Sequence, residues 1–226
     1  MIDLSTRLQL IASLVPHCDI AADVGTDHGY LAAWLLENNI IRRVYATDIH
    51  AGPLERAKRT AEEADLTAGM EFHLCDGLQF PGADRADAVI VAGMGGETMI
   101  SILQAAPWSW KDRSLVLQPQ SKQRELFQWL SAHGIFIEEA KLCLDAGKLY
   151  CAFRAKGGNG DTATVEDLLL ASHDPLLPVY LEHEVLRLER AARAMQNATR
   201  DMQSELRDIH TQLTYLNHYR KAVESW

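Results

Sequence analysis

The chain has 226 residues, a net charge of −9 at pH 7 and 47% hydrophobic residues. This length predicts one α/β domain of ordinary size with an appendage. The acidic charge argues against a general nucleic-acid coat, although it leaves room for a local RNA site. No apolar run approaches the roughly 20 residues of a membrane-spanning helix, so we expect a cytoplasmic protein that uses no membrane. Four scattered cysteines without a Cys-x-x-Cys pair predict no metal site.

The first predicted strand ends in an unusual acidic turn. Residues 4–15 have apolar side chains at helical spacing, and the strand that follows, residues 20–24, is apolar except for Asp23. It runs into a turn bounded by Gly25 and Gly29, without the G-x-G-x-x-G spacing of dinucleotide sites. Asp23 and Asp27 would repel a pyrophosphate, so the turn favours a cationic ligand such as S-adenosylmethionine (SAM). An ordinary strand-to-helix turn is the alternative.

Acidic residues also close the next two strands. Residues 42–49 form a strand with Asp48 near its end, about 25 residues after Asp23, where an acid can accept hydrogen bonds from ribose hydroxyls. Residues 70–74 form a third strand that leads into Asp76 and Gly77, and we expect this acid to face an adenine amino group. Helices are predicted between these strands at residues 30–38 and 52–64.

The fourth strand, residues 87–92, is a continuous apolar run of the kind that is buried in a parallel sheet. It leads into Gly93-Met94-Gly95-Gly96, where a substrate could lie against bare backbone; a tight turn is the alternative. A helix at 97–105, a strand at 114–117 followed by Gln118-Pro119-Gln120, a helix at 122–133 and a hairpin of residues 135–144 and 149–155 complete the pattern. It predicts a seven-stranded α/β sheet with its ligands at the carboxyl ends of the strands.

The pattern changes after a glycine-rich linker at residues 157–161. Apolar residues then recur at alternating spacings of four and three, which predicts a coiled coil. An antiparallel hairpin is favoured, with Thr199 as a candidate cap of its second helix. We therefore expect two domains, at residues 1–156 and 165–226. The seam comprises Leu181, Val185, Leu188, Ala192, Met195, Thr199, Met202, Leu206, Ile209, Leu213 and Leu216.

Short motifs, taken together and in order, resemble the bacterial TrmK-type tRNA (adenine(22)-N1)-methyltransferases. They are Leu4-Ser5-Thr6-Arg7-Leu8, Asp23-Val24-Gly25-Thr26-Asp27-His28-Gly29-Tyr30-Leu31, Asp76-Gly77-Leu78, Ala92-Gly93-Met94-Gly95-Gly96, Leu117-Gln118-Pro119 and Gly147-Lys148-Leu149-Tyr150. The chain departs from the family pattern at Gln120, where asparagine is usual, and at Cys151, where an acid is usual.

The resemblance implies a Rossmann-like class I SAM-dependent methyltransferase sheet with a C-terminal helical coiled-coil hairpin, acting as a monomer or homodimer. It implies methylation of N1 of adenosine 22, in the D-arm region of tRNA. The cofactor residues that it implies, together with those expected from the strand ends, are Arg7, Asp23, Gly25, Asp48, Ile49, Asp76, Gly77, Ala92 and Gly93. The expected substrate residues are Tyr30, Met94, Gly95, Gly96, Gln118 and Pro119.

The chemistry itself suggests which residues act. Adenine N1 has a free lone pair at neutral pH, so positioning can supply much of the acceleration without a strong base. Methylation leaves positive charge on the ring, and a carboxylate can stabilise that charge or accept an N6 proton. Asp27 is the first candidate, with His28 as its partner. Either Tyr30 or Trp108 and Trp110 could stack on a displaced base.

Two other classes of function remain open from the sequence. The chain could be a SAM enzyme for a small molecule or a protein, with the coiled coil serving dimerisation. It could also be a non-catalytic module that binds RNA or SAM. Candidate phosphate contacts, among which the sequence does not choose, are the C-terminal arginines and Arg42, Arg43, Lys111, Arg113, Lys122 and Arg124.

Overall fold

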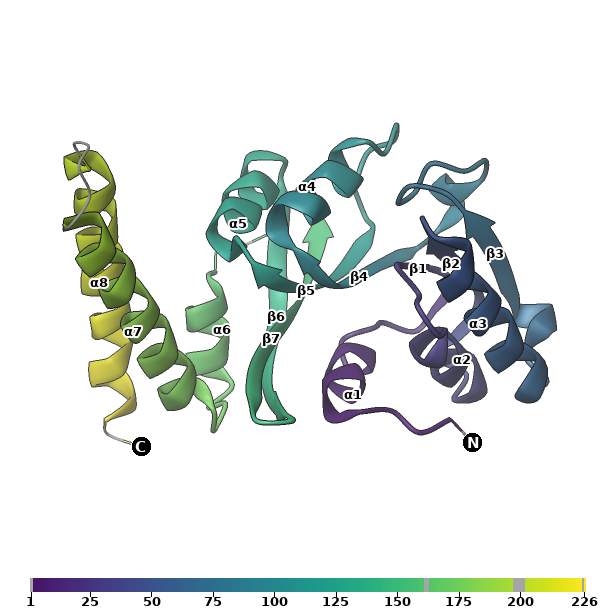
Figure 1. Cartoon of the computed structure of the whole chain (residues 1–226), viewed down its shortest axis with the longest axis horizontal. Coiled ribbons are helices and arrows are strands. Elements are labelled where there is room, and N and C mark those ends of the chain that lie inside the picture. The colour runs from purple at the N-terminus through teal and green to yellow at the C-terminus, as the bar shows by residue number, and fades with distance from the viewer. Residues whose placement is uncertain (1, 161–162, 197–201, 225) are drawn as a thin grey trace. The chain divides into compact units, whose positions relative to one another are not determined.

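The structure is a computed structural model that describes residues 2–160, 163–196, 202–224 and 226. The chain divides into two compact units, Met1–Val165 and Glu166–Trp226. The first unit contains one seven-stranded sheet in the order β3-β2-β1-β4-β5-β7-β6 (Figure 1). The predicted α/β sheet is therefore confirmed.

Strands and helices alternate along the first unit until the final hairpin. The strands are β1 (Cys18–Val24), β2 (Ile41–Asp48), β3 (Met70–Leu74), β4 (Ala88–Gly95), β5 (Ser114–Ser121), β6 (Ile135–Asp145) and β7 (Lys148–Gly157). The α-helices are α1 (Thr6–Ala12), α2 (Tyr30–Glu37), α3 (Ala51–Glu63), α4 (Gly96–Gln104) and α5 (Gln123–Ala132), with short 3₁₀ turns η1 (Thr67–Gly69) and η2 (Ala83–Arg85).

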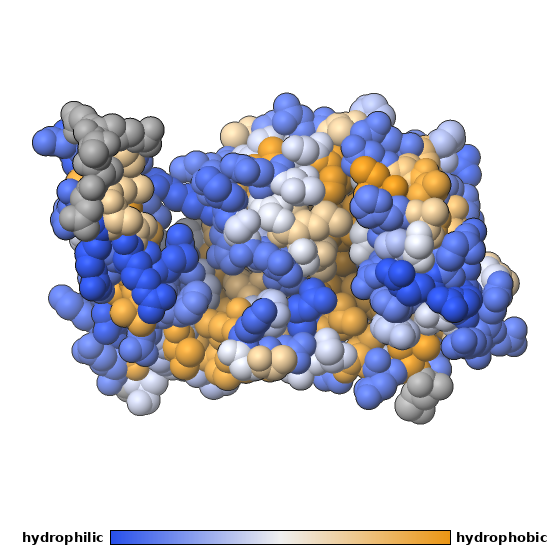
Figure 2. All heavy atoms as spheres, viewed as in Figure 1, coloured by the Kyte–Doolittle hydropathy of each residue, from blue (hydrophilic) through white to orange (hydrophobic). Residues whose placement is uncertain are grey.

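The first five strands in sequence run parallel, and β7 joins β5 antiparallel. Helices α1, α2 and α3 lie on one face of the sheet, and α4 and α5 lie on the other (Figure 1). Strands β1 and β4 are central and covered on both faces, which explains their continuous apolar sequences. Buried side chains such as Ala21, Val89 and Ile90 form the core there. Figure 2 shows hydrophilic residues over most of the visible surface, with hydrophobic patches between them.

Strands β4 and β5 are longer than the sequence predicts. The pattern places a loop at residues 93–96 and ends the fifth strand at residue 117, whereas pairing continues to Gly95 on β4 and to Ser121 on β5. The sequence pattern does not predict this extension, because glycine and proline are disfavoured in regular strands. The ladder accommodates them through register shifts on both sides of Met94.

The second unit consists of three helices, α6 (Val165–Ala171, which begins at the boundary), α7 (Leu177–Gln196) and α8 (Gln203–Val223). The predicted pair of long helices is confirmed, and α7 and α8 lie side by side (Figure 1). Knobs-into-holes packing stays a prediction, and the expected cap at Thr199 lies outside the described residues. The predicted seam supplies most of their buried side chains, and Leu177, Tyr180 and Tyr219 supply the others. The buried seam residues are Leu181, Val185, Leu188, Ala192, Ile209 and Leu216. In the described chain, no helix is long and apolar enough to cross a membrane.

Candidate functional site

The parallel strands bring the predicted acids and the glycine loop to one edge of the sheet, here called the carboxyl edge. Val24 pairs with Thr47 on one side and with Val91 on the other. The ends of β1, β2 and β4 are thus level, and β3 pairs with β2 up to Asp48. Asp23, Asp48, Asp76 and Gly93 all lie at this edge because parallel strands end on the same side.

Asp23 is almost completely buried at the end of β1, with 6% of its surface exposed. Its Oδ2 accepts a hydrogen bond of 2.7 Å from the Thr26 hydroxyl. Burial raises the pKa of the Asp23 carboxyl to about 6, and the nearby Asp48 charge adds to that effect. A desolvated carboxylate of this kind attracts a positively charged ligand, because burial has removed the water that otherwise screens it.

Asp48 is the last residue of β2, and Ile49 directly follows it. Asp48 Oδ1 accepts a hydrogen bond of 2.8 Å from the His50 backbone N–H, at the start of α3, so Oδ2 is the oxygen available to a ligand hydroxyl. Ile49 is 61% exposed. A large apolar side chain left exposed beside a carboxylate is chemically suited to the flat face of an adenine.

The loop after β3 is tied to β2 through its backbone. The buried hydroxyl of Thr47 donates a hydrogen bond of 3.0 Å to the Gly77 carbonyl oxygen. Gly77 has a φ of +59°, and a Cβ there would lie 3.0 Å from Ile102 Cγ2. This glycine therefore has a packing role, whereas the adjacent Asp76 is exposed and open to a ligand.

Three of the glycines at the carboxyl edge pack against the protein itself. A Cβ at Gly25 would collide with the Met94 side chain, so the turn after β1 and the end of β4 touch each other. A Cβ at Gly96 would collide with the Lys122 carbonyl, and one at Gly95 would crowd the Ser121 hydroxyl at 3.0 Å. Packing alone accounts for these two glycines, and their predicted contact with substrate stays a prediction.

Gly93 differs, because its neighbours are long polar side chains. A Cβ there would lie 3.4 Å from Arg7 Nη1 and 3.7 Å from Gln120 Nε2. Arg7 Nη1 also donates a hydrogen bond of 3.1 Å to Gln118 Oε1, and its guanidinium lies 5.7 Å from the centre of the Tyr150 ring. The Gln118 amide nitrogen donates to the Pro119 carbonyl oxygen. Both polar groups of the buried Gln118 side chain are thereby engaged, the oxygen with Arg7 and the nitrogen with Pro119.

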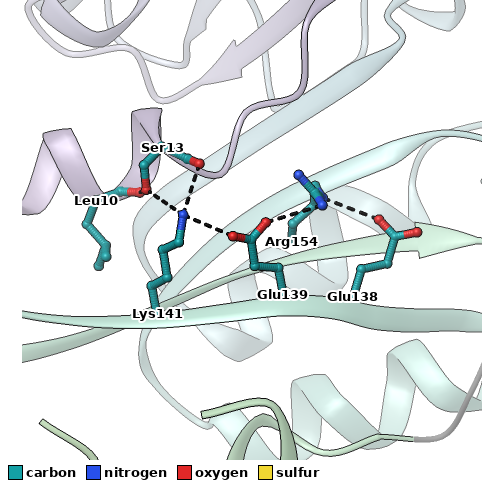
Figure 3. A network of polar contacts seen from close by, with 6 residues as sticks. All are labelled: Leu10, Ser13, Glu138, Glu139, Lys141 and Arg154. Atoms are coloured by element: carbon teal, nitrogen blue, oxygen red, sulfur yellow. Dashed lines mark hydrogen bonds and ion pairs between the residues drawn. The ribbon is translucent and has the colours of Figure 1, made fainter. Parts of the chain in front are cut away.

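Helix α1 carries Arg7 and is fastened to β6 at both ends. The Arg7 backbone N–H donates a hydrogen bond of 3.2 Å to Asp145 Oδ2. At the other end, Lys141 Nζ donates to the carbonyl and hydroxyl oxygens of Ser13, each at 3.2 Å (Figure 3). Lys141 in turn is paired with Glu139, at 2.9 Å, and Arg154 bridges Glu139 and Glu138. The outer hairpin thus sets where α1 places the guanidinium.

Asp27 lies in the turn after β1 with a φ of +49°, and 67% of its side chain is exposed. Arg56 Nη2 on α3 is 3.0 Å from Asp27 Oδ1, and His28 Nε2 is 3.8 Å from the same oxygen. Oδ2 is therefore the oxygen of Asp27 that remains without a partner among the described residues. Arg56 is not predictable from the sequence, because nothing in the local pattern marks one charged residue of an amphipathic helix as the partner of a distant acid.

The His28 and Tyr30 rings lie next to Asp27 and are stacked on each other, with centres 5.4 Å apart and planes 11° apart. Tyr30 is 45% exposed. Trp108 and Trp110 precede β5 and so lie at the opposite edge of the sheet, where Trp110 is buried. The expectation that these tryptophans could stack on a displaced base is therefore wrong, and stacking by Tyr30 stays a prediction.

The same topology sorts the candidate phosphate contacts. Arg42, Arg43, Lys111 and Arg113 lie at or before the starts of β2 and β5, away from the carboxyl edge. Only Lys122 and Arg124, among the six named residues, follow the end of β5. Lys122 is paired with Glu125 at 3.0 Å and with Glu97 at 3.5 Å.

The sheet order, the acids at three successive strand ends and the acid-glycine turn define a Rossmann-like methyltransferase domain. The methyltransferase domain family matches residues 4–153. In the described parts of the chain, no group of three or more His, Cys, Asp or Glu side chains could hold a metal ion.

Sequence and structural similarity to known proteins identifies the family within this class. The chain is 33% identical to the tRNA (adenine(22)-N(1))-methyltransferase of Bacillus subtilis over 162 residues, which cover 71% of this chain and 68% of that protein. Its fold matches that of Streptococcus pneumoniae Sp1610, to which tRNA (m1A22) methyltransferase activity has been ascribed, with a TM-score of 0.80, 26% identity, and 96% and 100% of the two chains covered. The same protein in complex with SAM matches with a TM-score of 0.78, 26% identity and the same coverage. The chain belongs to the tRNA (adenine(22)-N(1))-methyltransferase family.

Proposed function

We propose that this protein transfers the methyl group of SAM to N1 of adenosine 22 in tRNA. The observation that carries the proposal is its membership of a family whose Bacillus subtilis relative has this named activity. The carboxyl edge independently supports the SAM-binding part of the proposal, since it combines the buried acid Asp23, the strand-end acid Asp48 and the exposed apolar side chain of Ile49. No feature of the site favours a small-molecule or protein substrate over RNA.

The residues at the carboxyl edge fit SAM. The buried Asp23 carboxylate suits the positively charged methionine end, and Asp48 Oδ2 suits the ribose hydroxyls. Ile49 and the exposed Asp76 suit the face and the amino group of the adenine. Arg7, whose guanidinium lies beside Gly93, is suited to the methionine carboxylate because arginine pairs with carboxylates through a planar fork.

When bound, SAM supplies the methyl group: the bond from adenine N1 to carbon forms as the carbon–sulfur bond breaks, and the bonding pair stays on sulfur. The protein's task is to hold the N1 lone pair in line with that carbon, which can lower the barrier by roughly 7–11 kcal/mol. Asp27 Oδ2 then faces the positive charge that develops on the ring, and stabilises it or accepts an N6 proton.

Recognition of tRNA requires that the target base be displaced from its stack and that the phosphate backbone of the tRNA be bound. The stacked rings of His28 and Tyr30 offer a flat surface beside Asp27 for an extruded adenine, whose displacement costs a few kcal/mol. Arg124 and Lys122 lie at the same edge and suit phosphates. The expected contribution of the C-terminal helices is tested by deleting residues 161–226, which should weaken tRNA binding.

The experiment is methylation of an unmodified tRNA transcript with methyl-labelled SAM, compared with the same transcript carrying guanosine at position 22. We expect label in the first transcript only, and a block to reverse transcription at position 22, because a methyl group on N1 prevents Watson–Crick pairing. If SAM raises the melting temperature while neither transcript gains label, the tRNA activity is refuted and another methyl acceptor must be sought.

A further inference from the structure

Two successive bulges interrupt the β4–β5 ladder at the carboxyl edge. Ala92 pairs with Gln118, and the next pair is Met94 with Pro119, so Gly93 is an extra residue on β4. The following pair is Gly95 with Ser121, so Gln120 is an extra residue on β5. Bulges next to active sites redirect side chains, and here the two extra residues face each other across the ladder.

The Gln120 amide is exposed and unengaged. Its Nε2 is 3.7 Å from the position of a Cβ at Gly93, whose own φ of +78° is favoured in glycine. Among the described residues, no hydrogen bond or ion pair involves the Gln120 side chain, whereas both amide groups of Gln118 are engaged with Arg7 and Pro119. The bulge therefore presents one free amide, with one donor and one acceptor group, beside Gly93 at the carboxyl edge.

We propose that Gln120 binds N6 and N7 of the target adenine; this inference rests on the proposed function. A glutamine amide matches that edge in a bidentate manner, since Oε1 accepts from the N6 amino group and Nε2 donates to N7. Guanine presents two acceptors there, O6 and N7, so the amide oxygen would face a repelling oxygen. Binding at N6 and N7 leaves the N1 lone pair free for the methyl group.

The same contact strengthens during the reaction. Methylation at N1 spreads positive charge onto N6, which makes its N–H a better donor to Gln120 Oε1. An interaction that is stronger in the transition state than in the ground state raises kcat as well as kcat/KM. Gln120 thus contributes to both the choice of adenine and the rate, without transferring a proton itself.

The test combines a change in the enzyme with a change of one atom in the RNA. Native tRNA and tRNA with 7-deazaadenosine at position 22 are methylated by the wild type, by Gln120→Ala and by the control Gln104→Ala, an exposed glutamine at the end of α4. We expect Gln120→Ala to lose roughly 10- to 100-fold in kcat/KM on native tRNA, the range of a bidentate base contact. The 7-deaza substitution should penalise the wild type and the control, and leave Gln120→Ala without further loss.

The wild type and Gln120→Ala are assayed on the same two RNAs. Any intrinsic effect of the 7-deaza ring on the reactivity of N1 therefore cancels when their 7-deaza penalties are compared. An equal 7-deaza penalty in Gln120→Ala and wild type overturns the inference, as does wild-type activity of Gln120→Ala on native tRNA. SAM affinity of Gln120→Ala should match the wild type, and a large loss would instead assign Gln120 to the cofactor. Failure of the wild type to methylate native tRNA would refute the proposed function, a result distinct from all of these.

Discussion

Arg56 on α3 holds the carboxylate of Asp27, with 3.0 Å between Arg56 Nη2 and Asp27 Oδ1. The two residues lie 29 positions apart in the sequence. The ion pair gives an otherwise exposed acid a fixed orientation, with His28 near the same oxygen. The turn after β1 thus contains one buried acid, Asp23, and one exposed acid, Asp27, that is paired with an arginine.

Replacing Asp27 should affect transfer rather than cofactor binding. Asp27→Asn keeps the shape and removes the charge, and we expect kcat to fall roughly 100-fold, within the range of a positioned acid–base group. SAM affinity, measured by calorimetry, should change little. A large loss of SAM affinity with an unchanged kcat would reassign Asp27 to the cofactor.

Arg56 should act through Asp27. We expect Arg56→Met to lower kcat about tenfold because the carboxylate loses its orientation, and Arg56→Lys to recover part of the rate. The control is Arg59→Met, an exposed arginine of the same helix. Single-turnover kinetics with saturating SAM measure the effect. An increase in kcat would show that Arg56 competes with the adenine for the carboxylate.

The raised pKa of Asp23 predicts opposite effects on stability and binding. The carboxyl has a pKa of about 6 in the folded protein and an ordinary value of 3.8, so the folded state holds its proton more tightly. Its contribution to stability is therefore present below about pH 4 and is lost as pH rises to about 6, by an amount on the order of 3 kcal/mol. SAM affinity should follow the reverse course and fall as the pH drops below 6, because the protonated acid no longer attracts a cation.

Asp23→Asn separates these two effects. Without SAM, its melting temperature should exceed that of the wild type by more at pH 7 than at pH 4, because the cost of the buried charge is removed. Its SAM affinity should be lower and nearly independent of pH between 5 and 7. Parallel pH dependences for the two proteins in both measurements would contradict the assignment.

Arg7 should recognise the amino-acid part of the cofactor. We expect Arg7→Ala to weaken SAM binding about tenfold, as for the loss of one charge-assisted contact. Affinity for 5′-methylthioadenosine, which lacks the amino-acid part, should be unchanged. Gln118→Ala should give a smaller loss in the same direction, because Gln118 only positions the guanidinium. Equal losses for both ligands would place Arg7 elsewhere in the site.

Lys141 should affect SAM affinity indirectly, by fixing the position of α1. We expect Lys141→Met to raise the Kd for SAM a few-fold, because the cation no longer fixes the Ser13 carbonyl at the helix end. In an Arg7→Ala background the same change should have no further effect. Lys156→Met, an exposed lysine on β7, serves as the control. Additive losses in the double variant would mean that Lys141 acts independently of Arg7.

Some of the site can be predicted from sequence because parallel strands impose order. Once three strands are recognised, their terminal residues Asp23, Asp48 and Asp76 must lie at one edge, whatever the details of packing. Trp108 and Trp110 lie at the other edge for the same physical reason, because the helix that follows β4 returns the chain to the start of β5.

The sequence by itself determined the seven-stranded α/β sheet, the acidic carboxyl edge and the family, because these follow from local periodicity and short motifs. Only the tertiary structure decided how Arg56 meets Asp27, how Lys141 reaches Ser13, and how the paired bulges turn Gln120 toward Gly93. These contacts join segments through side-chain packing and ladder register. Side-chain packing and ladder register produce no periodic pattern in the sequence, since each depends on the relative positions of two separate elements.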